Sequence, residues 1–160
     1  MPMTMRRMKI RPSVSFRTEK GTSLVEAAFI MPLLLLLTFS MVDFATLFYA
    51  YLALENGVSQ ASRYGVTGSL GAGLSRQESI KKAMRQATPT LTIDDGAFTF
   101  SHLRPGQGTW DAGVGGPNDI DKVTVNYSWA LMTPLMRPFF TNGRVTLTVE
   151  SAMKNEARFQ

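Results

Sequence analysis

Residues 27–54 read AAFIMPLLLLLTFSMVDFATLFYAYLAL, and this apolar stretch decides the fold. From Ala27 to Val42 it carries no charge, and a helix of about 20 apolar residues crosses the hydrocarbon core of a bilayer. After Asp43, apolar side chains recur at three- and four-residue spacing, which indicates one face of a continuing helix. The sequence therefore predicts one membrane-spanning helix that leaves the membrane unbroken and ends near Tyr64.

The charges on either side of the apolar stretch predict its direction. Residues 1–20 contain six Lys or Arg against one Glu, whereas Arg63 and Arg76 are the only basic residues from 55 to 76. Because basic flanks stay in the cytoplasm, we expect a single-pass protein of the bacterial inner membrane with a cytoplasmic N-terminus and an extracytoplasmic C-terminal domain. The alternative of a cleaved secretory signal peptide is disfavoured, since the apolar run is too long and large aromatic residues follow it.

Composition argues against several classes of function. The net charge of +5 belongs to the leader, because the other 140 residues hold 11 acidic and 11 basic side chains, so no basic face for nucleic acid is expected. The chain has no cysteine, and its one histidine, His102, lies in no catalytic motif. The glycine-rich stretches lack phosphate-binding motifs. We expect no enzyme activity, no cofactor, no metal site and no small-molecule substrate.

The residues after the apolar helix predict a small domain that begins with a second helix. Glycines at four positions from 65 to 73 interrupt the helical pattern and read as a flexible link. Ser75 and Glu78 then have the spacing of a capping box, and an apolar face continues from Ile80 until Pro89 stops the helix.

Beyond Pro89 the apolar period changes to two, which is typical of strands with one buried face. We expect three or four antiparallel strands, the first two joined by a turn at 94–96, over Thr90–Ile93, Ala97–His102, Lys122–Trp129 and Arg144–Glu150. The fold class is therefore α+β, with a long N-terminal transmembrane helix, a second helix and a small antiparallel sheet.

Residues 104–119, between the second and third predicted strands, are rich in Gly and Pro and predict an exposed loop. Oxygen ligands gather in and just after it, so a calcium site was considered at Asp111, Asn118, Asp119 and Asp121. Their spacing does not match a calcium-binding helix-loop-helix, and Asp and Asn beside Gly are ordinary turn residues. The loop is therefore interpreted as structural.

The junction between the leader and the helix reads EKGTSLVE over residues 19–26. A glycine after a basic leader, with a glutamate five positions later at the head of an apolar helix, resembles the type IV prepilin processing site. That resemblance implies cleavage by a membrane prepilin peptidase between Gly21 and Thr22. It also implies that Glu26 pairs with the new amino group of Thr22 on a neighbouring subunit and helps to set the register between subunits. Asp43, costly at membrane depth, contacts either a partner helix or water at the outer boundary.

A wider segment is similar to the TadE-like proteins, pseudopilins of the tight-adherence (Flp) pilus system. The features that carry the similarity are Gly21, Val25-Glu26, Pro32-Leu33-Leu34, Asp43-Phe44, Phe48-Tyr49, the stretch from Asn56 to Arg63, and the later runs VTVNYSWALMTPLM and VTLTVESAM. Many relatives carry cysteines in the exported region, and this chain has none, so no disulfide is inferred.

The resemblance implies a minor pilin-like subunit needed to assemble a type IVb Flp pilus for cell adhesion. Its parts would be a leader over 1–21, a transmembrane and extended helix over 22–64 and an extracytoplasmic domain over 65–160. The implied partners are the membrane, prepilin peptidase and other pilin or pseudopilin subunits. The alternative is an uncleaved, single-pass anchored protein that binds the envelope or a secretion component.

Overall fold

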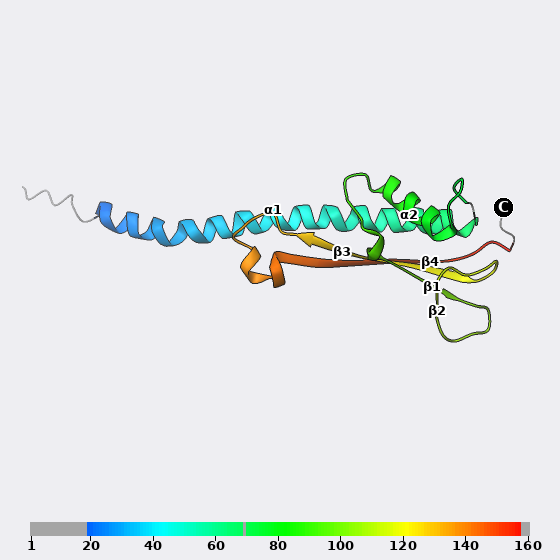
Figure 1. Ribbon diagram of the computed structural model, residues 1–160. Coiled ribbons are helices and arrows are strands. Elements are labelled where there is room, and N and C mark those ends of the chain that lie inside the picture. Colours follow the sequence, from blue (N-terminus) through cyan, green and yellow to red (C-terminus); the bar gives the residue numbers. More distant parts are fainter. Residues whose placement is uncertain (1–18, 69, 158–160) are drawn as a thin grey trace, which may run out of the picture. The chain divides into compact units, whose positions relative to one another are not determined.

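The structure, a computed structural model, describes residues 19–68 and 70–157. It divides into two compact units, one ending at Thr38 and the other starting at Phe39. Helix α1, Glu19–Val66, runs through both (Figure 1). It begins before and ends after the predicted helix of 22–64. Most of the predicted leader, residues 1–18, lies outside the described residues.

The first unit is described as the N-terminal part of α1. The helix passes through Pro32 without interruption, and almost all of its described side chains, from Ser23 onward, are exposed. By length and composition, α1 is able to cross a membrane, and none of its most apolar stretch is buried within the chain. A core helix of a globular domain would be buried, so this finding favours the predicted span.

The second unit combines the rest of α1 with helix α2, Arg76–Ala87, and a four-stranded sheet. The strands are β1, Phe98–Leu103; β2, Asp111–Ala112; β3, Ile120–Ala130; and β4, Arg144–Lys154. Three short 3-10 helices, η1, η2 and η3, cover Asp95–Ala97, Arg137–Phe139 and Thr141–Gly143. The predicted α+β class, with a second helix and a small antiparallel sheet, is confirmed.

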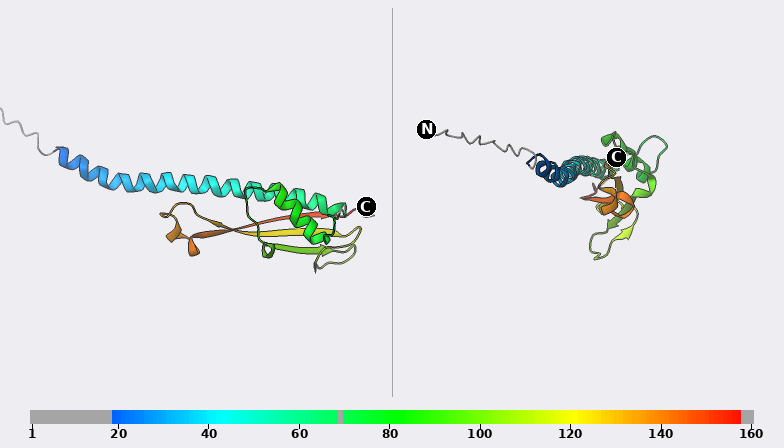
Figure 2. Two further views of the ribbon diagram at one scale, coloured as in Figure 1. Left: turned by 45° about the horizontal axis from the view of Figure 1, so that its top comes forward. Right: turned by 90° about the vertical axis from the view of Figure 1, so that its left-hand side faces the viewer.

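All pairings in the sheet are antiparallel, and the strand order is β2-β1-β3-β4. The longest ladder joins β3 to β4, from Ile120 opposite Lys154 to Ala130 opposite Arg144. Alternate residues on β3, including Val123 and Val125, are buried, as a sheet with one covered face requires. Figure 2 shows β3 and β4 running alongside α1 in the second unit.

The core of the second unit lies between the helices and this covered face of the sheet. Small and branched side chains on α1 allow close packing, and they meet apolar residues from α2, the segment before β1, and three strands. The buried members are Ala50, Leu54, Val58, Ala61, Ile80, Met84, Leu91, Ile93, Phe98, Phe100, Val123, Val125, Leu147 and Val149.

Helix α2 begins with the predicted capping box. The Ser75 hydroxyl accepts a hydrogen bond from the Glu78 backbone N–H at 3.3 Å, and the Glu78 carboxylate accepts one from the Ser75 N–H at 2.9 Å. The helix ends at Ala87, two residues before Pro89. Thr88 caps the C-terminal end of α2, and its methyl group lies against Gly57 of α1. A β-carbon added at Gly57 would be only 2.5 Å from this methyl group.

One local prediction is wrong, and a second holds for most of its residues. Residues Thr90–Ile93 form no strand, because the segment makes no strand pairing and begins in a turn after α2. Leu91 and Ile93 within it are nevertheless buried. Its alternation reflects one-sided packing without strand pairing, and its place in the sheet is taken by the two-residue β2. The 104–119 loop is exposed over most of its length, but Gly115 and Asp119 within it are buried.

Candidate functional site: the apolar helix and its contacts

The predicted processing junction lies in the first turns of α1. The helix begins at Glu19, so Gly21 and Thr22 are inside it, and Glu26 follows Thr22 by one helical turn. Residues four apart lie on the same side of a helix, and the Glu26 side chain is exposed. The structure therefore places the predicted cleavage position within the first turn of α1 and leaves Glu26 open to contact.

An exposed run of α1 follows the junction. From Ser23 to Val42 no side chain is buried, and only Leu36 and Ser40 are half-buried. At a rise of about 1.5 Å per residue, these residues extend for about 30 Å, the thickness of a bilayer's hydrocarbon core. Among the α1 side chains described from Ser23 onward, the first buried one is that of Asp43, directly after this run.

Asp43 is bound by its own chain. Its side chain is 3% exposed, and its Oδ1 accepts hydrogen bonds from the backbone N–H groups of Met132 at 2.8 Å and Thr133 at 3.1 Å. The Thr133 hydroxyl donates to Oδ2. Neither alternative considered from the sequence, a partner helix or water, describes this arrangement. A carboxylate that would be costly next to lipid is enclosed by three donors from the segment after β3.

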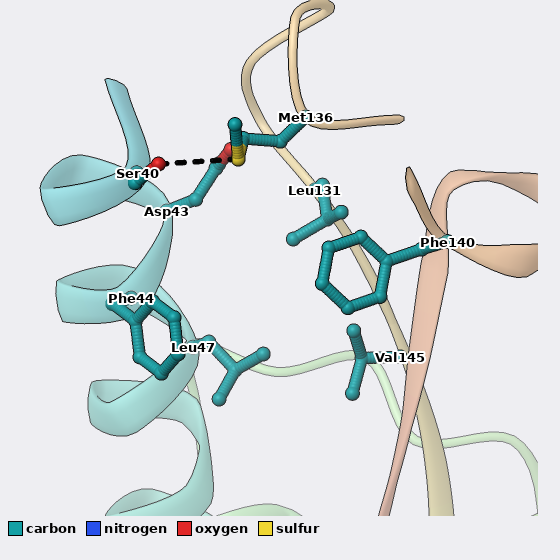
Figure 3. A pocket seen from close by; sticks show the side chains of 8 residues that line it. All are labelled: Ser40, Asp43, Phe44, Leu47, Leu131, Met136, Phe140 and Val145. Carbon is teal, nitrogen blue, oxygen red and sulfur yellow. Dashed lines mark hydrogen bonds between the residues drawn. The ribbon is translucent and has the colours of Figure 1, made fainter. Parts of the chain in front are cut away.

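A mainly apolar cavity of about 230 Å³ adjoins this carboxylate. Figure 3 shows it between α1 and the segments that connect β3 to β4, with the Ser40 hydroxyl donating to the Met136 sulfur at 3.3 Å. The residues that line it are Ser40, Asp43, Phe44, Leu47, Leu131, Met136, Phe140 and Val145. Ser40 is hydrogen-bonded to Met136, and Asp43 is hydrogen-bonded to the 132–133 segment, so the chemistry of the cavity suits an apolar group.

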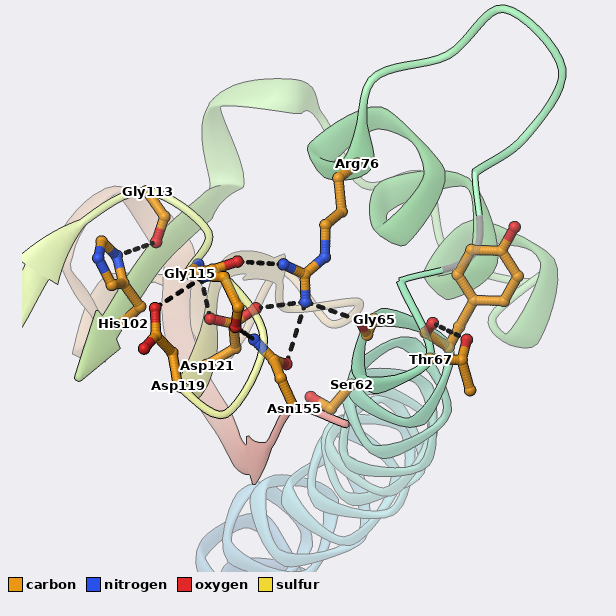
Figure 4. Close-up of polar contacts among 12 residues, drawn as sticks. Ser62, Gly65, Thr67, Arg76, His102, Gly113, Gly115, Asp119, Asp121 and Asn155 are labelled. Carbon is orange, nitrogen blue, oxygen red and sulfur yellow. Dashed lines mark hydrogen bonds and ion pairs between the residues drawn. The ribbon is translucent and has the colours of Figure 1, made fainter. Parts of the chain in front are cut away.

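At the other end of the second unit, Arg76 joins four segments (Figure 4). Its guanidinium donates to the carbonyl oxygens of Gly65 and Gly115, to the Asp121 carboxylate at 2.9 Å and to Asn155 at 3.0 Å. Burial lowers the pKa of Arg76, and the charge of Asp121 opposes that shift. This arrangement holds the end of α1, the start of α2, the 104–119 loop and the sheet together.

The acidic residues considered for calcium are occupied in this arrangement. Asp121 accepts from the Gly115 N–H at 2.7 Å as well as from Arg76, and Asp119 accepts from the Gly116 N–H at 2.7 Å. Within residues 19–68 and 70–157, no three His, Asp or Glu side chains are grouped to hold a metal ion. His102, on β1, is buried, and its Nδ1 lies 3.2 Å from the Gly113 carbonyl oxygen.

Sequence reasoning missed the partners of two charged residues. Nothing in the local pattern pointed to Met132 and Thr133 as donors to Asp43, or to Arg76 as the residue that holds the loop. One signal was present: a lone carboxylate within an apolar helix needs donors, and Thr-Pro at 133–134 supplies a hydroxyl close to a turn.

The described geometry defines a class of protein: a single candidate membrane helix that continues into an α+β domain. Residues 21–63 match the family model described as TadE, TadE-like protein, which confirms the predicted resemblance over that segment. Comparisons with curated proteins and with solved structures gave no match. The family match and the candidate membrane helix together indicate a membrane-anchored protein associated with a tight-adherence pilus system.

Proposed function

We propose that the chain is a minor pilin-like subunit that is inserted into the inner membrane with its N-terminus in the cytoplasm, and is cut by prepilin peptidase between Gly21 and Thr22. The observation that carries the proposal is the junction itself. The TadE-like match begins at Gly21, and Glu26 stands exposed at the head of an unburied apolar helix. The proposed work is helix packing in pilus assembly, without catalysis.

Glycine suits the proposed cleavage position because it brings no side chain into a protease cleft and adopts extended backbone readily. Cleavage would require the first turn of α1 to open, since Gly21 and Thr22 lie within the helix in the uncut chain. Helix ends open at low cost, because their first N–H groups have no partner within the helix.

Glu26 is proposed to set the register between subunits. In two parallel helices, pairing Glu26 of one with the Thr22 amino group of the next requires an axial shift of about one helical turn. The attraction between opposite charges is stronger in a medium of low dielectric constant than in water. Removing one partner of a buried pair leaves the other charge uncompensated, which is costly. The exposure of Glu26 leaves it available for that contact.

The deciding experiment is mass spectrometry of the membrane-bound product from the native host. The proposal expects a mature N-terminus at Thr22, and expects Gly21→Leu to leave the precursor uncut. Gly108→Leu, in an exposed loop where a β-carbon meets nothing within 4 Å, is the matched control and should be processed normally. A wild-type product that begins at Met1 would instead favour the anchored envelope or secretion component.

Glu26→Ala separates processing from assembly. The variant should be cut normally but should yield fewer pili on cells, counted by electron microscopy. Glu26→Gln, which keeps the shape and removes the charge, should show the same defect. Normal piliation in both variants would refute the register role.

A further inference from the structure

The segment between β3 and β4 displays apolar side chains outward. We call residues 131–140, LMTPLMRPFF, the 131–140 loop. Leu131 and Thr133 are buried, but four large apolar side chains are exposed: Met132 at 60%, Leu135 at 42%, Phe139 at 69% and Phe140 at 41%. A cluster of exposed apolar side chains on one loop marks a surface that contacts something other than water.

The loop is fixed at one level of α1. Asp43 binds Met132 and Thr133, and Ser40 donates to Met136, so both halves of the loop are held against residues 40–43 of the helix. These residues are the end of the exposed apolar run and the buried Asp43 that follows it, so burial on α1 begins here. Wherever that run ends in a bilayer, the loop lies beside its end.

The charge of the loop suits a lipid surface. Residues 131–143 contain no Asp or Glu, and their one charged side chain is the exposed Arg137. The nearest acidic side chain on α1, that of Asp43, is buried and accepts three hydrogen bonds from Met132 and Thr133, so it is not part of the exposed surface of the loop. Phe and Leu side chains partition into the apolar boundary of a bilayer, while a nearby Arg pairs with anionic headgroups.

We infer that the 131–140 loop rests on the outer face of the membrane beside the span, with Leu135 and Phe139 in the apolar boundary and Arg137 among lipid phosphates. The inference depends on membrane anchoring by α1 and is independent of processing at Gly21. The loop and the helix together give the domain two points of contact with the bilayer, and these fix its orientation.

The test uses the absence of cysteine in the chain. Single variants Phe139→Cys and Leu135→Cys, in the full chain, are labelled with an environment-sensitive fluorophore and placed singly in nanodiscs of phosphatidylcholine and phosphatidylglycerol. Gln107→Cys, in the exposed part of the 104–119 loop, is the matched control. Quenching is measured with iodide in the water and with lipids that carry a nitroxide near the headgroup.

Both loop positions should show blue-shifted emission, severalfold weaker quenching by iodide and severalfold stronger quenching by the nitroxide lipid than position 107. One chain per disc ensures that a second copy does not cover the loop. Iodide quenching at Phe139→Cys and Leu135→Cys equal to that of the control would overturn the inference. Emission shielded from both quenchers would overturn it as well, because the loop would then be covered by its own chain.

Discussion

Asp43 and Thr133, 90 residues apart in the chain, are joined by two hydrogen bonds, one from the Thr133 backbone N–H and one from its hydroxyl. Both residues are buried, Asp43 at 3% and Thr133 at 9% exposure. The pair connects the start of the second unit to the segment after β3. In an apolar setting, hydrogen bonds to a charged group are among the stronger polar contacts, so this pair is a clear target for substitution.

We predict that Thr133→Val destabilises the second unit by about 1.5–3 kcal/mol, the usual range for a hydrogen bond to a charged group. Asp43→Ala should cost more than Asp43→Asn, because alanine leaves the N–H groups of Met132 and Thr133 without an acceptor. The measurement is urea unfolding of the full chain in detergent micelles. The exposed Asp94→Asn is the control and should leave the unfolding midpoint unchanged.

Gly57→Ala should destabilise the chain, although alanine is favoured over glycine by about 1 kcal/mol within a helix. The added β-carbon would lie 2.5 Å from the Thr88 methyl, and overpacking of a close contact costs about 1–3 kcal/mol. Thr88→Ser removes that methyl and keeps the hydroxyl that donates to the Met84 carbonyl. The double variant should therefore be more stable than Gly57→Ala alone. Thermal unfolding that shows no such rescue would contradict the predicted close contact between α1 and the residue after α2.

Arg76→Met should cost about 3–5 kcal/mol, because it leaves the buried Asp121 carboxylate without its cation. Arg76→Lys should recover little of this lost stability. The guanidinium of Arg76 donates to the carbonyls of Gly65 and Gly115 and to Asn155, and a single ammonium group does not reach all three acceptors. Hydrogen exchange would report faster opening around Gly115. Arg104→Met, at an exposed position, serves as the comparison; equal effects of the two methionine variants would contradict the prediction.

The start of α2 should weaken in acid. The backbone N–H of Ser75, followed by its hydroxyl, lowers the pKa of Glu78 from its ordinary 4.5, and Arg85 lowers that of Asp95 from 3.8. Because these pKa values are lowered in the folded state, each ionised carboxylate contributes its full stabilisation at pH values above the pKa of the unfolded chain. It is lost as the pH falls through the folded-state pKa.

Glu78→Gln and Asp95→Asn should therefore each flatten the dependence of the unfolding midpoint on pH below about 5. Both carboxylates are at the surface, so added salt should reduce the contribution of Asp95 more than that of the Glu78 cap. Unchanged pH profiles in both variants would contradict this account.

Local patterns in the sequence predicted a large part of this fold. The start of α2 followed from Ser75 and Glu78, and apolar side chains at three- and four-residue spacing identified α1 beyond Asp43. Period-two alternation identified β3 and β4. These signals are local, because each depends on residues within one element.

The errors have a common physical origin, which is dependence on distant residues. Thr90–Ile93 has the alternation of a strand, but a strand also needs a neighbour with free backbone groups, and β1 pairs with β2 and β3 instead. The donors to Asp43 lie 89 and 90 positions away, and Asn155, bound to Arg76, lies 79 away. No spacing rule connects residues that far apart. The processing junction stays a prediction; it could be made from the sequence because its whole pattern fits within six residues, Gly21 to Glu26.

The binding of Asp43 by Met132 also has a consequence for synthesis. A ribosome adds Asp43 89 residues before Met132, the first of the donors that enclose this carboxylate. Since chains are made from the N-terminus, α1 is complete before any donor to Asp43 has been added. Only a chain that extends through Thr133 has all three donors and is able to enclose this carboxylate. Closure of this one site therefore distinguishes a chain made through Thr133 from a shorter one.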